Sequence, residues 1–103
     1  MYLTVRRYKI APESTPELMR RTQQEFLPIV SKVPGFIEYF CSFAGEDEMF
    51  SVNVFKDRAG AEESVRAAAA YVREHQSLFP NAPEVISGEV IAHETREEAE
   101  KAA

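Results

Sequence analysis

The alternation of apolar and polar positions divides the chain into six elements. Residues 2–10 are rich in β-forming side chains and predict a strand. From Thr15 onward, mostly apolar side chains recur at steps of three or four, which predicts a helix. This stripe consists of Leu18, Thr22, Phe26, Ile29 and Val33. Pro28 lacks a backbone N–H, so we expect the helix to kink or break there. Pro34 and Gly35 end it.

The second half of the chain begins with a hairpin. Residues 36–44 and 49–56 predict two strands, joined by a polar turn that contains a glycine at 45–48. Asp57 is a suitable cap for a second helix over 58–79. The apolar stripe of this helix consists of Ala61, Val65, Ala68, Ala69, Val72 and Phe79. The run from Ala67 to Ala70 favours a helix and is small enough to let another group approach closely.

The remaining segments complete the predicted topology. The proline-rich stretch 80–83 stops the second helix, and residues 85–93 predict a fourth strand. The order βαββαβ is typical of a ferredoxin-like α+β fold, an antiparallel four-stranded sheet with both helices on one face and the first strand between the third and fourth. We expect one domain over residues 1–93 and a charged, mobile tail over 94–103.

The two faces of the predicted sheet differ in composition. We expect the more apolar set of alternate positions to face the helices: Leu3, Val5, Arg7, Phe50, Val52, Val54, Ile86, Gly88, Val90 and Ala92. The other set mixes large apolar side chains with polar ones: Tyr2, Thr4, Arg6, Tyr8, Met49, Ser51, Asn53, Phe55, Val85, Ser87, Glu89, Ile91 and His93. Exposed apolar area of this kind marks an interface, so we expect a homodimer through this second face. The strand over 36–44 is apolar on both faces, which also favours a partner.

Composition and charge exclude several classes of protein. The chain has 103 residues, of which 45% are hydrophobic and 28% charged, as in a single globular domain. A net charge of −5 argues against nucleic-acid binding. No apolar run reaches the roughly 18 residues of a membrane-spanning helix. Cys41 is the single cysteine and the first residues lack a secretory signal, so we expect no disulfide and a cytoplasmic location.

Polar residues on the second face are candidates for chemistry. Arg6, Asn53 and Glu89 fall on the same face of neighbouring predicted strands. One interpretation is structural: an Arg6–Glu89 ion pair, with Asn53 beside it, fixes the register of the dimer. The other is functional: Arg6 holds a phenolate or carboxylate in a cavity, and Glu89 or Asn53 handles a proton.

Two further candidates lie on the second predicted helix. Tyr71 and His75 are four residues apart, so they stack on one flank. A histidine that faces a pocket could act as a base or a haem ligand; otherwise it is a partly exposed helix residue. We expect His93 to be solvated and Cys41 to be an inert, small hydrophobic side chain. No histidine and carboxylate spacing fits a metal site, and the glycine patterns of nucleotide-binding loops are absent, so we expect no metal and no cofactor.

Four stretches carry a resemblance to a known family: PGF at 34–36, VFKDRAGAEES at 54–64, YVREH at 71–75 and EVISGEV at 84–90. With these stretches the chain, over residues 2–93, resembles the antibiotic biosynthesis monooxygenase-like domains of the dimeric α+β barrel superfamily, in a small bacterial branch. The resemblance implies a ferredoxin-like fold, a homodimer whose sheets close a barrel, and a pocket between sheet and helices.

The family resemblance also implies a range of activities. Active members oxidise aromatic polyketide-type phenols with O₂ and no bound cofactor, while others degrade haem, decarboxylate or isomerise. The oxygenases rely on a tryptophan with Asn, Tyr and Arg neighbours. This chain has no tryptophan, and Phe55 stands where many relatives carry one.

Three functional hypotheses follow. The first is a cofactor-independent, monooxygenase-like enzyme for a small aromatic, with Arg6, Asn53, Tyr71 and His75 as candidate catalytic residues. The second is a non-catalytic homodimer that binds a small ligand or another protein. The third is a haem-binding protein in which His75 is the ligand.

Overall fold

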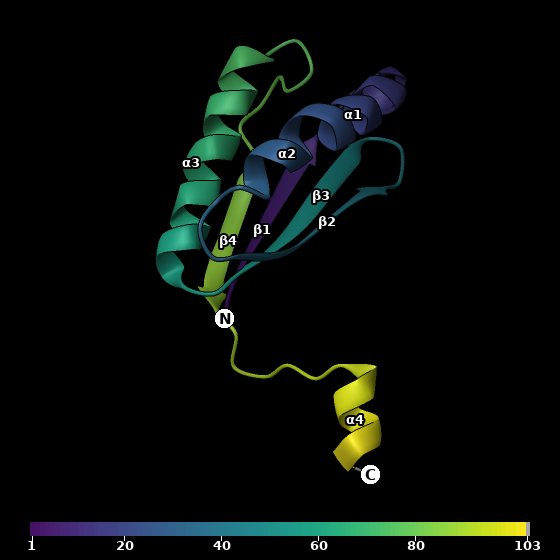
Figure 1. The fold of residues 1–103 in the computed structure, drawn as a ribbon. Helices are drawn as coiled ribbons and strands as arrows, with labels where there is room; N and C mark the ends of the chain where they lie inside the picture. The colour runs from purple at the N-terminus through teal and green to yellow at the C-terminus, as the bar shows by residue number, and fades with distance from the viewer. Residues whose placement is uncertain (103) are drawn as a thin grey trace.

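The strands assemble in the predicted topology. The computed structural model describes residues 1–102, and its four strands form one antiparallel sheet in the order β2–β3–β1–β4. β1 spans Tyr2–Lys9, β2 Phe36–Ala44, β3 Glu48–Phe55 and β4 Glu84–Glu89. β1 therefore lies between β3 and β4, and the ferredoxin-like α+β arrangement is confirmed (Figure 1).

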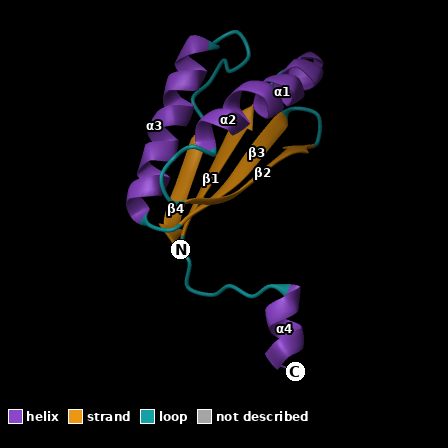
Figure 2. Cartoon of the chain, in the orientation of Figure 1, coloured by secondary structure: helices purple, strands orange, loops and turns teal. Residues whose placement is uncertain are grey.

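The first helical region covers one face of the sheet and contains the predicted irregularity (Figure 2). After a short 3₁₀ turn, α1 spans Thr15–Arg21, a π-helical turn η2 spans Thr22–Phe26, and α2 spans Leu27–Val30. The Leu27 N–H bonds to the carbonyl of Thr22, five residues back. This wider turn leads into Pro28, which has no N–H to offer to the regular helical ladder.

The second long helix, α3, spans Arg58–Glu74 on the same side of the sheet. Asp57 caps it, because its side chain accepts a hydrogen bond of 3.1 Å from the Gly60 N–H. The predicted end at Phe79 is wrong: at His75 the backbone leaves the helical region, with φ −131° and ψ 45°. The following turn nevertheless returns Phe79 to the core, where its ring lies 5.3 Å from that of Tyr8.

The last strand is shorter than predicted because β1, the strand with which it pairs, begins at Tyr2. β4 ends at Glu89, which pairs with Tyr2, the first residue of β1. One more bond follows, from the Val90 N–H to the Met1 carbonyl at 2.9 Å. The chain then leads to α4 (Arg96–Ala102), whose residues are all exposed and which lies apart from the sheet (Figure 1). None of the helices within residues 1–102 has the length and apolarity to cross a membrane.

The faces of the sheet are the reverse of the sequence-based expectation. Two sets of alternate residues are buried beneath the helices: Thr4, Arg6 and Tyr8 of β1, and Met49, Ser51, Asn53 and Phe55 of β3. The aliphatic set, with Val5 and Val52, lies on the uncovered face. The expectation was wrong because apolarity alone does not decide which face is buried. The polar groups beneath the helices bond to one another, which makes their burial tolerable.

An apolar row crosses the uncovered face. Cross-strand pairing aligns Phe40 with Val52, Val52 with Val5, and Val5 with Ile86, one residue from each strand. The two residues at its ends are well exposed, with 55% of Phe40 and 71% of Ile86 accessible to solvent. We call these four residues the apolar row. Together with Tyr39 and Phe43 on the opposite face, Phe40 makes β2 apolar on both faces, as predicted.

Candidate functional site

A cluster of buried polar side chains lies between the sheet and α3. The Arg6 guanidinium donates from Nη2 to Asn53 Oδ1 at 2.7 Å and from Nη1 to Ser64 Oγ at 3.5 Å. Asn53 Nδ2 in turn donates to Ser51 Oγ at 3.2 Å. Arg6 is 1% exposed and Asn53 is fully buried. The structure thus brings two of the candidate residues into direct contact, on the helix-covered face of the sheet.

The positive charge of Arg6 has no acidic partner. Within residues 1–102 no carboxylate forms an ion pair with it, and its Nε atom is buried without a hydrogen-bond acceptor. The expected Arg6–Glu89 pair is wrong, because Arg6 pairs along the sheet with Val85 while Glu89 lies opposite Tyr2. The ring centre of Phe26 is 5.8 Å from the guanidinium carbon. Fully buried arginines without a counter-charge are rare in proteins.

A pocket of about 320 Å³ opens beside Arg6, between α3, β4 and the loop that precedes β4. Apart from Arg6 and Arg73, its lining is made of small apolar side chains, among them Val65, Ala68 and Val72 of α3. The small residues predicted to allow close approach therefore line this pocket. Its volume lies at the lower end of the range for small-molecule sites, roughly 300–1,000 Å³.

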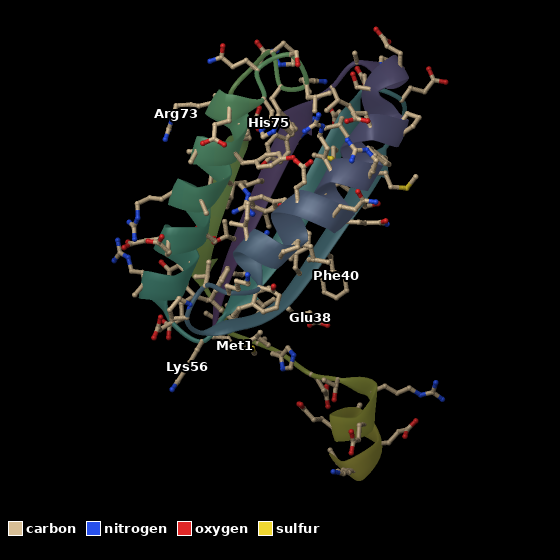
Figure 3. All side chains as sticks on the ribbon, turned by 45° about the horizontal axis from the view of Figure 1, so that its top comes forward. Met1, Glu38, Phe40, Lys56, Arg73 and His75 are labelled. Carbon is tan, nitrogen blue, oxygen red and sulfur yellow. The ribbon has the colours of Figure 1, made fainter. Side chains whose placement is uncertain are left out.

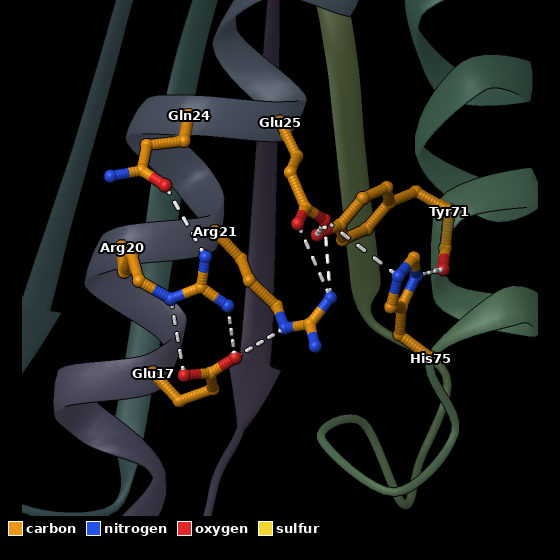
Figure 4. Close-up of polar contacts among 7 residues, drawn as sticks. All are labelled: Glu17, Arg20, Arg21, Gln24, Glu25, Tyr71 and His75. Carbon is orange, nitrogen blue, oxygen red and sulfur yellow. Dashed lines mark hydrogen bonds and ion pairs between the residues drawn. The ribbon is translucent and has the colours of Figure 1, made fainter.

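The other two candidates form a second cluster at the carboxyl end of α3 (Figure 4). The rings of Tyr71 and His75 stack with their centres 4.0 Å apart, as predicted. The Tyr71 hydroxyl donates to Glu25 Oε1 at 2.7 Å, and His75 Nε2 lies 3.8 Å from the same oxygen. His75 Nδ1 is 2.8 Å from the Tyr71 carbonyl oxygen. Arg21, one helical turn before Glu25, contacts its carboxylate at 3.2 Å.

The environment of this cluster fixes the protonation of its tyrosine. Burial, and then the charge and hydrogen bond of Glu25, raise the pKa of Tyr71 to about 12. The hydrogen bond from Tyr71, with Arg21 nearby, lowers the pKa of the Glu25 carboxyl. At neutral pH Tyr71 is therefore a hydrogen-bond donor to a carboxylate and not a base.

The two clusters share one layer but do not line one pocket. Phe26 lies between them, since its ring is 5.6 Å from that of Tyr71 as well as near Arg6. Tyr71 borders a narrow space of about 20 Å³ next to Phe26, too small for an aromatic ligand. We expected Arg6 and Asn53 on the face of the sheet away from the helices; the structure instead buries them beneath the helices, on the same side of the sheet as Tyr71 and His75.

A second pocket, of about 280 Å³, lies at the β2 edge of the layer. Cys41, which is exposed, lines it together with Met19, Phe43 and Met49. His93, which we expected to be solvated, is exposed. In residues 1–102 no three His, Cys, Asp or Glu side chains gather as they would around a metal ion.

Sequence reasoning missed Ser64, Phe26 and Arg73 as neighbours of the site. Ser64 carried a weak signal, because it is a polar residue beside the apolar stripe of its helix. Phe26 was assigned to the core, where it does lie, and its contact with Arg6 depends on how the helix crosses the sheet. Arg73 gave no signal, since exposed arginines are common on helices.

Comparisons with known proteins find similarity in structure and not in sequence. The sequence matches no protein-family model, and no curated protein matches it. NE2512 from Nitrosomonas europaea, a protein of unknown function, is 20% identical with a TM-score of 0.75, over 91% of this chain and 92% of that one. ActVA-Orf6 of Streptomyces coelicolor, a monooxygenase solved with the ligand Nanaomycin D, is 13% identical with a TM-score of 0.71, over 91% and 90%.

A third similar structure is a variant of SnoaB from Streptomyces nogalater, a cofactor-independent oxygenase. It is 13% identical with a TM-score of 0.65, over 89% of this chain and 94% of that one. The structural similarity agrees with the resemblance of the sequence motifs. The chain therefore has the ferredoxin-like α+β fold of the antibiotic biosynthesis monooxygenase-like proteins.

Proposed function

We propose that the chain is a cofactor-independent, monooxygenase-type enzyme that oxidises a small aromatic in the pocket between α3 and β4. The observation that carries this proposal is the Arg6–Asn53 pair, a buried and fixed guanidinium beside an apolar pocket of about 320 Å³. The shared fold with ActVA-Orf6 and SnoaB supports it by analogy. With its single free cysteine, the chain suits a reducing bacterial cytoplasm.

The chemistry requires a substrate that reacts with O₂ once it is ionised. A positive charge close to a phenol lowers the pKa of the hydroxyl and stabilises the phenolate, so Arg6 can promote ionisation without a separate base. The phenolate then reduces O₂. One oxygen atom enters the ring as a second carbonyl, and the other leaves as water with the two hydrogens that the phenol gives up. Oxidation of the phenol to the quinone releases four electrons, and O₂ accepts four in forming the carbonyl oxygen and water, so no external reductant is needed.

Asn53 acts in this scheme as a positioning residue. Its oxygen accepts from Arg6 and its nitrogen donates to Ser51, so its polar atoms are already engaged. In this scheme Arg6 supplies the positive charge next to the pocket. Tyr71 and His75 lie outside this pocket, and as candidate catalytic residues they have to be tested by their own variants.

Oxygen consumption with a panel of naphthols, anthrones and larger phenols tests the proposal. We expect wild-type turnover with at least one member, and a loss of about 100-fold or more in kcat/KM for Arg6→Gln. Arg7→Gln is the matched control, because Arg7 is exposed on the other face and bonds to Glu48. Tyr71→Phe and His75→Gln should retain turnover. Absence of wild-type turnover, or full activity of Arg6→Gln, would overturn the proposal; binding without turnover would favour a non-catalytic ligand-binding protein.

We further propose that the chain forms a homodimer through the uncovered face of the sheet. The apolar row, with Phe40 and Ile86 largely exposed, is the type of surface that a second copy covers. In a two-fold symmetric dimer the same row lies on both sides of the interface, so apolar side chains meet apolar side chains. This interface uses the face opposite to the one expected from the sequence, and it leaves the pocket beside Arg6 on the helix side.

A further inference from the structure

Three of the four sulfur-containing side chains line one pocket. The sequence holds a single cysteine and three methionines. Met19, Cys41 and Met49 all line the pocket of about 280 Å³ at the β2 edge. The fourth, Met1, lies at the other end of β1 (Figure 3), because Met49 pairs with Tyr8 near the last residue of that strand. Apart from the first residue, all sulfur-containing side chains therefore border one pocket, although they come from three different elements.

The register of the sheet brings two of these side chains together. Cys41 on β2 pairs with Ser51 on β3, and Met49 lies two positions from Ser51 along β3. Since side chains alternate along a strand, Cys41 and Met49 lie on the same face, beneath the helices. Diagonal neighbours of this kind are roughly 7–8 Å apart, within reach of long side chains. Met19 of α1 completes the set from the helical layer above.

The three side chains differ in exposure, which gives the pocket a buried base and an open entrance. Met49 is 4% exposed and Met19 is 50% exposed. Cys41 is an exposed residue. A methionine side chain has three rotatable bonds, so the thioether of Met19 can move to follow a bound group. A small solute can therefore enter from solvent and meet a fixed thioether at the base of the pocket.

The donor atoms of this pocket favour a soft cation. Thiolates and thioethers bind Cu(I), whereas Mg²⁺ and Ca²⁺ take oxygen ligands and structural Zn²⁺ takes four cysteine or histidine ligands. Within residues 1–102, no carboxylate or imidazole lines the pocket. Desolvation raises the pKa of the Cys41 thiol, so at neutral pH the thiol keeps its proton and is a poor nucleophile. A soft cation, unlike a carbon electrophile, binds the thiolate by displacing that proton.

We propose that Met19, Cys41 and Met49 bind one soft monovalent cation, Cu(I) or its analogue Ag(I), through one thiolate and two thioethers. The cation replaces the proton of the Cys41 thiol, which passes to solvent, and no electron is transferred. Thiolate and monovalent cation together carry no net charge, so the complex avoids the cost of burying one. The pocket shares no lining residue with the pocket beside Arg6, so the inference is independent of the proposed oxidation.

Titration of the full chain with metal ions under anaerobic conditions tests the inference. Cu(I) is added with bicinchoninate as a coloured competitor, and Ag(I) binding is measured by calorimetry. We expect Cys41→Ser, Met19→Leu and Met49→Leu each to weaken binding by at least the roughly 10–100-fold that loss of a supporting group costs a metal site. The leucine variants keep the apolar volume of the pocket. Gln23→Leu is the matched control, because Gln23 lines the same pocket without a sulfur atom, and it should bind as wild type does.

X-ray absorption at the copper edge counts the sulfur neighbours of the bound ion. Wild type should show three, Met19→Leu and Met49→Leu should each show two, and excess Zn²⁺ should not displace the copper. Circular dichroism checks folding, and Cys41→Ala replaces Cys41→Ser if the latter does not fold. Binding that requires Cys41 but neither methionine would show a thiol that captures metal alone and would overturn the inference. A wild-type chain that binds Cu(I) no more tightly than Cys41→Ser would do the same, whether or not the chain consumes oxygen.

Discussion

Asn53 accepts a hydrogen bond of 2.7 Å from Arg6, and this bond joins two neighbouring strands inside the layer between sheet and helices. Arg6 lies on β1 and Asn53 on β3, two residue pairs apart along the ladder, because Arg6 pairs with Ser51 and Asn53 with Thr4. The contact at Ser64 is much longer, at 3.5 Å, so Asn53 is the main partner of a buried charge. The stability of the fold should therefore depend on Asn53 chiefly through Arg6.

A double-mutant cycle measures this dependence. We expect Asn53→Leu to lower the free energy of unfolding by about 1.5–3 kcal/mol, the usual contribution of a hydrogen bond to a charged group. In an Arg6→Met background the same substitution should cost about 1 kcal/mol or less, because no buried charge is left to desolvate. Urea denaturation of the four proteins gives the coupling energy. If the effects of the two substitutions on the free energy of unfolding simply add, Arg6 and Asn53 do not stabilise each other and the argument is wrong.

The order of elements was predictable because it depends on local signals. Asp57 as a cap and the Gly45 turn are encoded in short stretches, and the structure places both as expected. The ends of the last helix and strand were not predictable in this way. β4 stops where β1 begins, and that limit comes from a strand far away in the sequence.

The sequence is sufficient to predict that Arg6 and Asn53 lie on the same face of the sheet, but not which face is buried or which pocket lies beside them. The alternation of side chains along a strand places Arg6 and Asn53 on one face whichever face is buried. Which face the helices cover depends on the whole set of contacts. Here they cover the more polar face, whose burial is tolerable because Asn53 and Ser51 bond to each other and Asn53 also bonds to the Thr4 carbonyl. The pocket itself is formed by α3 and the loop before β4, which only the folded chain brings together.

The dimer proposal predicts a charge-sensitive interface at the apolar row. Ile86→Glu should convert a dimer to a monomer, because a two-fold interface buries the new carboxylate on both sides without a partner. We expect the dimer dissociation constant to rise by about 30-fold or more, as for an interface residue worth 2 kcal/mol. Ile91→Glu is the control, since Ile91 is 98% exposed beyond the end of β4. Light scattering at micromolar concentration distinguishes the two forms. A wild-type monomer would contradict the interface itself.

The close approach of α3 to the loop before β2 predicts a strict requirement for glycine at position 60. A Cβ atom there would lie 2.7 Å from the Pro34 carbonyl oxygen and 3.1 Å from the Phe55 ring. We therefore expect Gly60→Ala to destabilise the fold by about 1–3 kcal/mol through steric strain. Gly88→Ala should have little effect, because a Cβ at that position meets nothing within 4 Å. Thermal unfolding of the two variants provides the measurement, and equal melting temperatures would refute the argument.

The raised pKa of Tyr71 predicts a loss of stability in alkali. Its ordinary value is 10.0, and in the folded chain burial and Glu25 raise the pKa to about 12. Between these values the unfolded chain has released the proton while the native chain still holds it, so the free energy of unfolding falls as pH rises. This contribution is complete below pH 10 and is lost as pH approaches 12. Tyr8 and Tyr39, whose pKa values burial also raises, add to the same decline.

The variant Tyr71→Phe separates the contribution of Tyr71 to the alkaline loss of stability from those of Tyr8 and Tyr39. The variant should show a shallower fall in the urea midpoint between pH 9 and pH 11.5, because a phenylalanine has no proton to lose in either state. Glu25→Gln should lie between the variant and wild type, since it removes the charge but keeps an acceptor for the hydroxyl at 2.7 Å. Identical slopes in wild type and Tyr71→Phe would mean that the hydroxyl does not retain its proton in the folded state. The bond between Tyr71 and Glu25 would then not hold η2 against α3 at high pH.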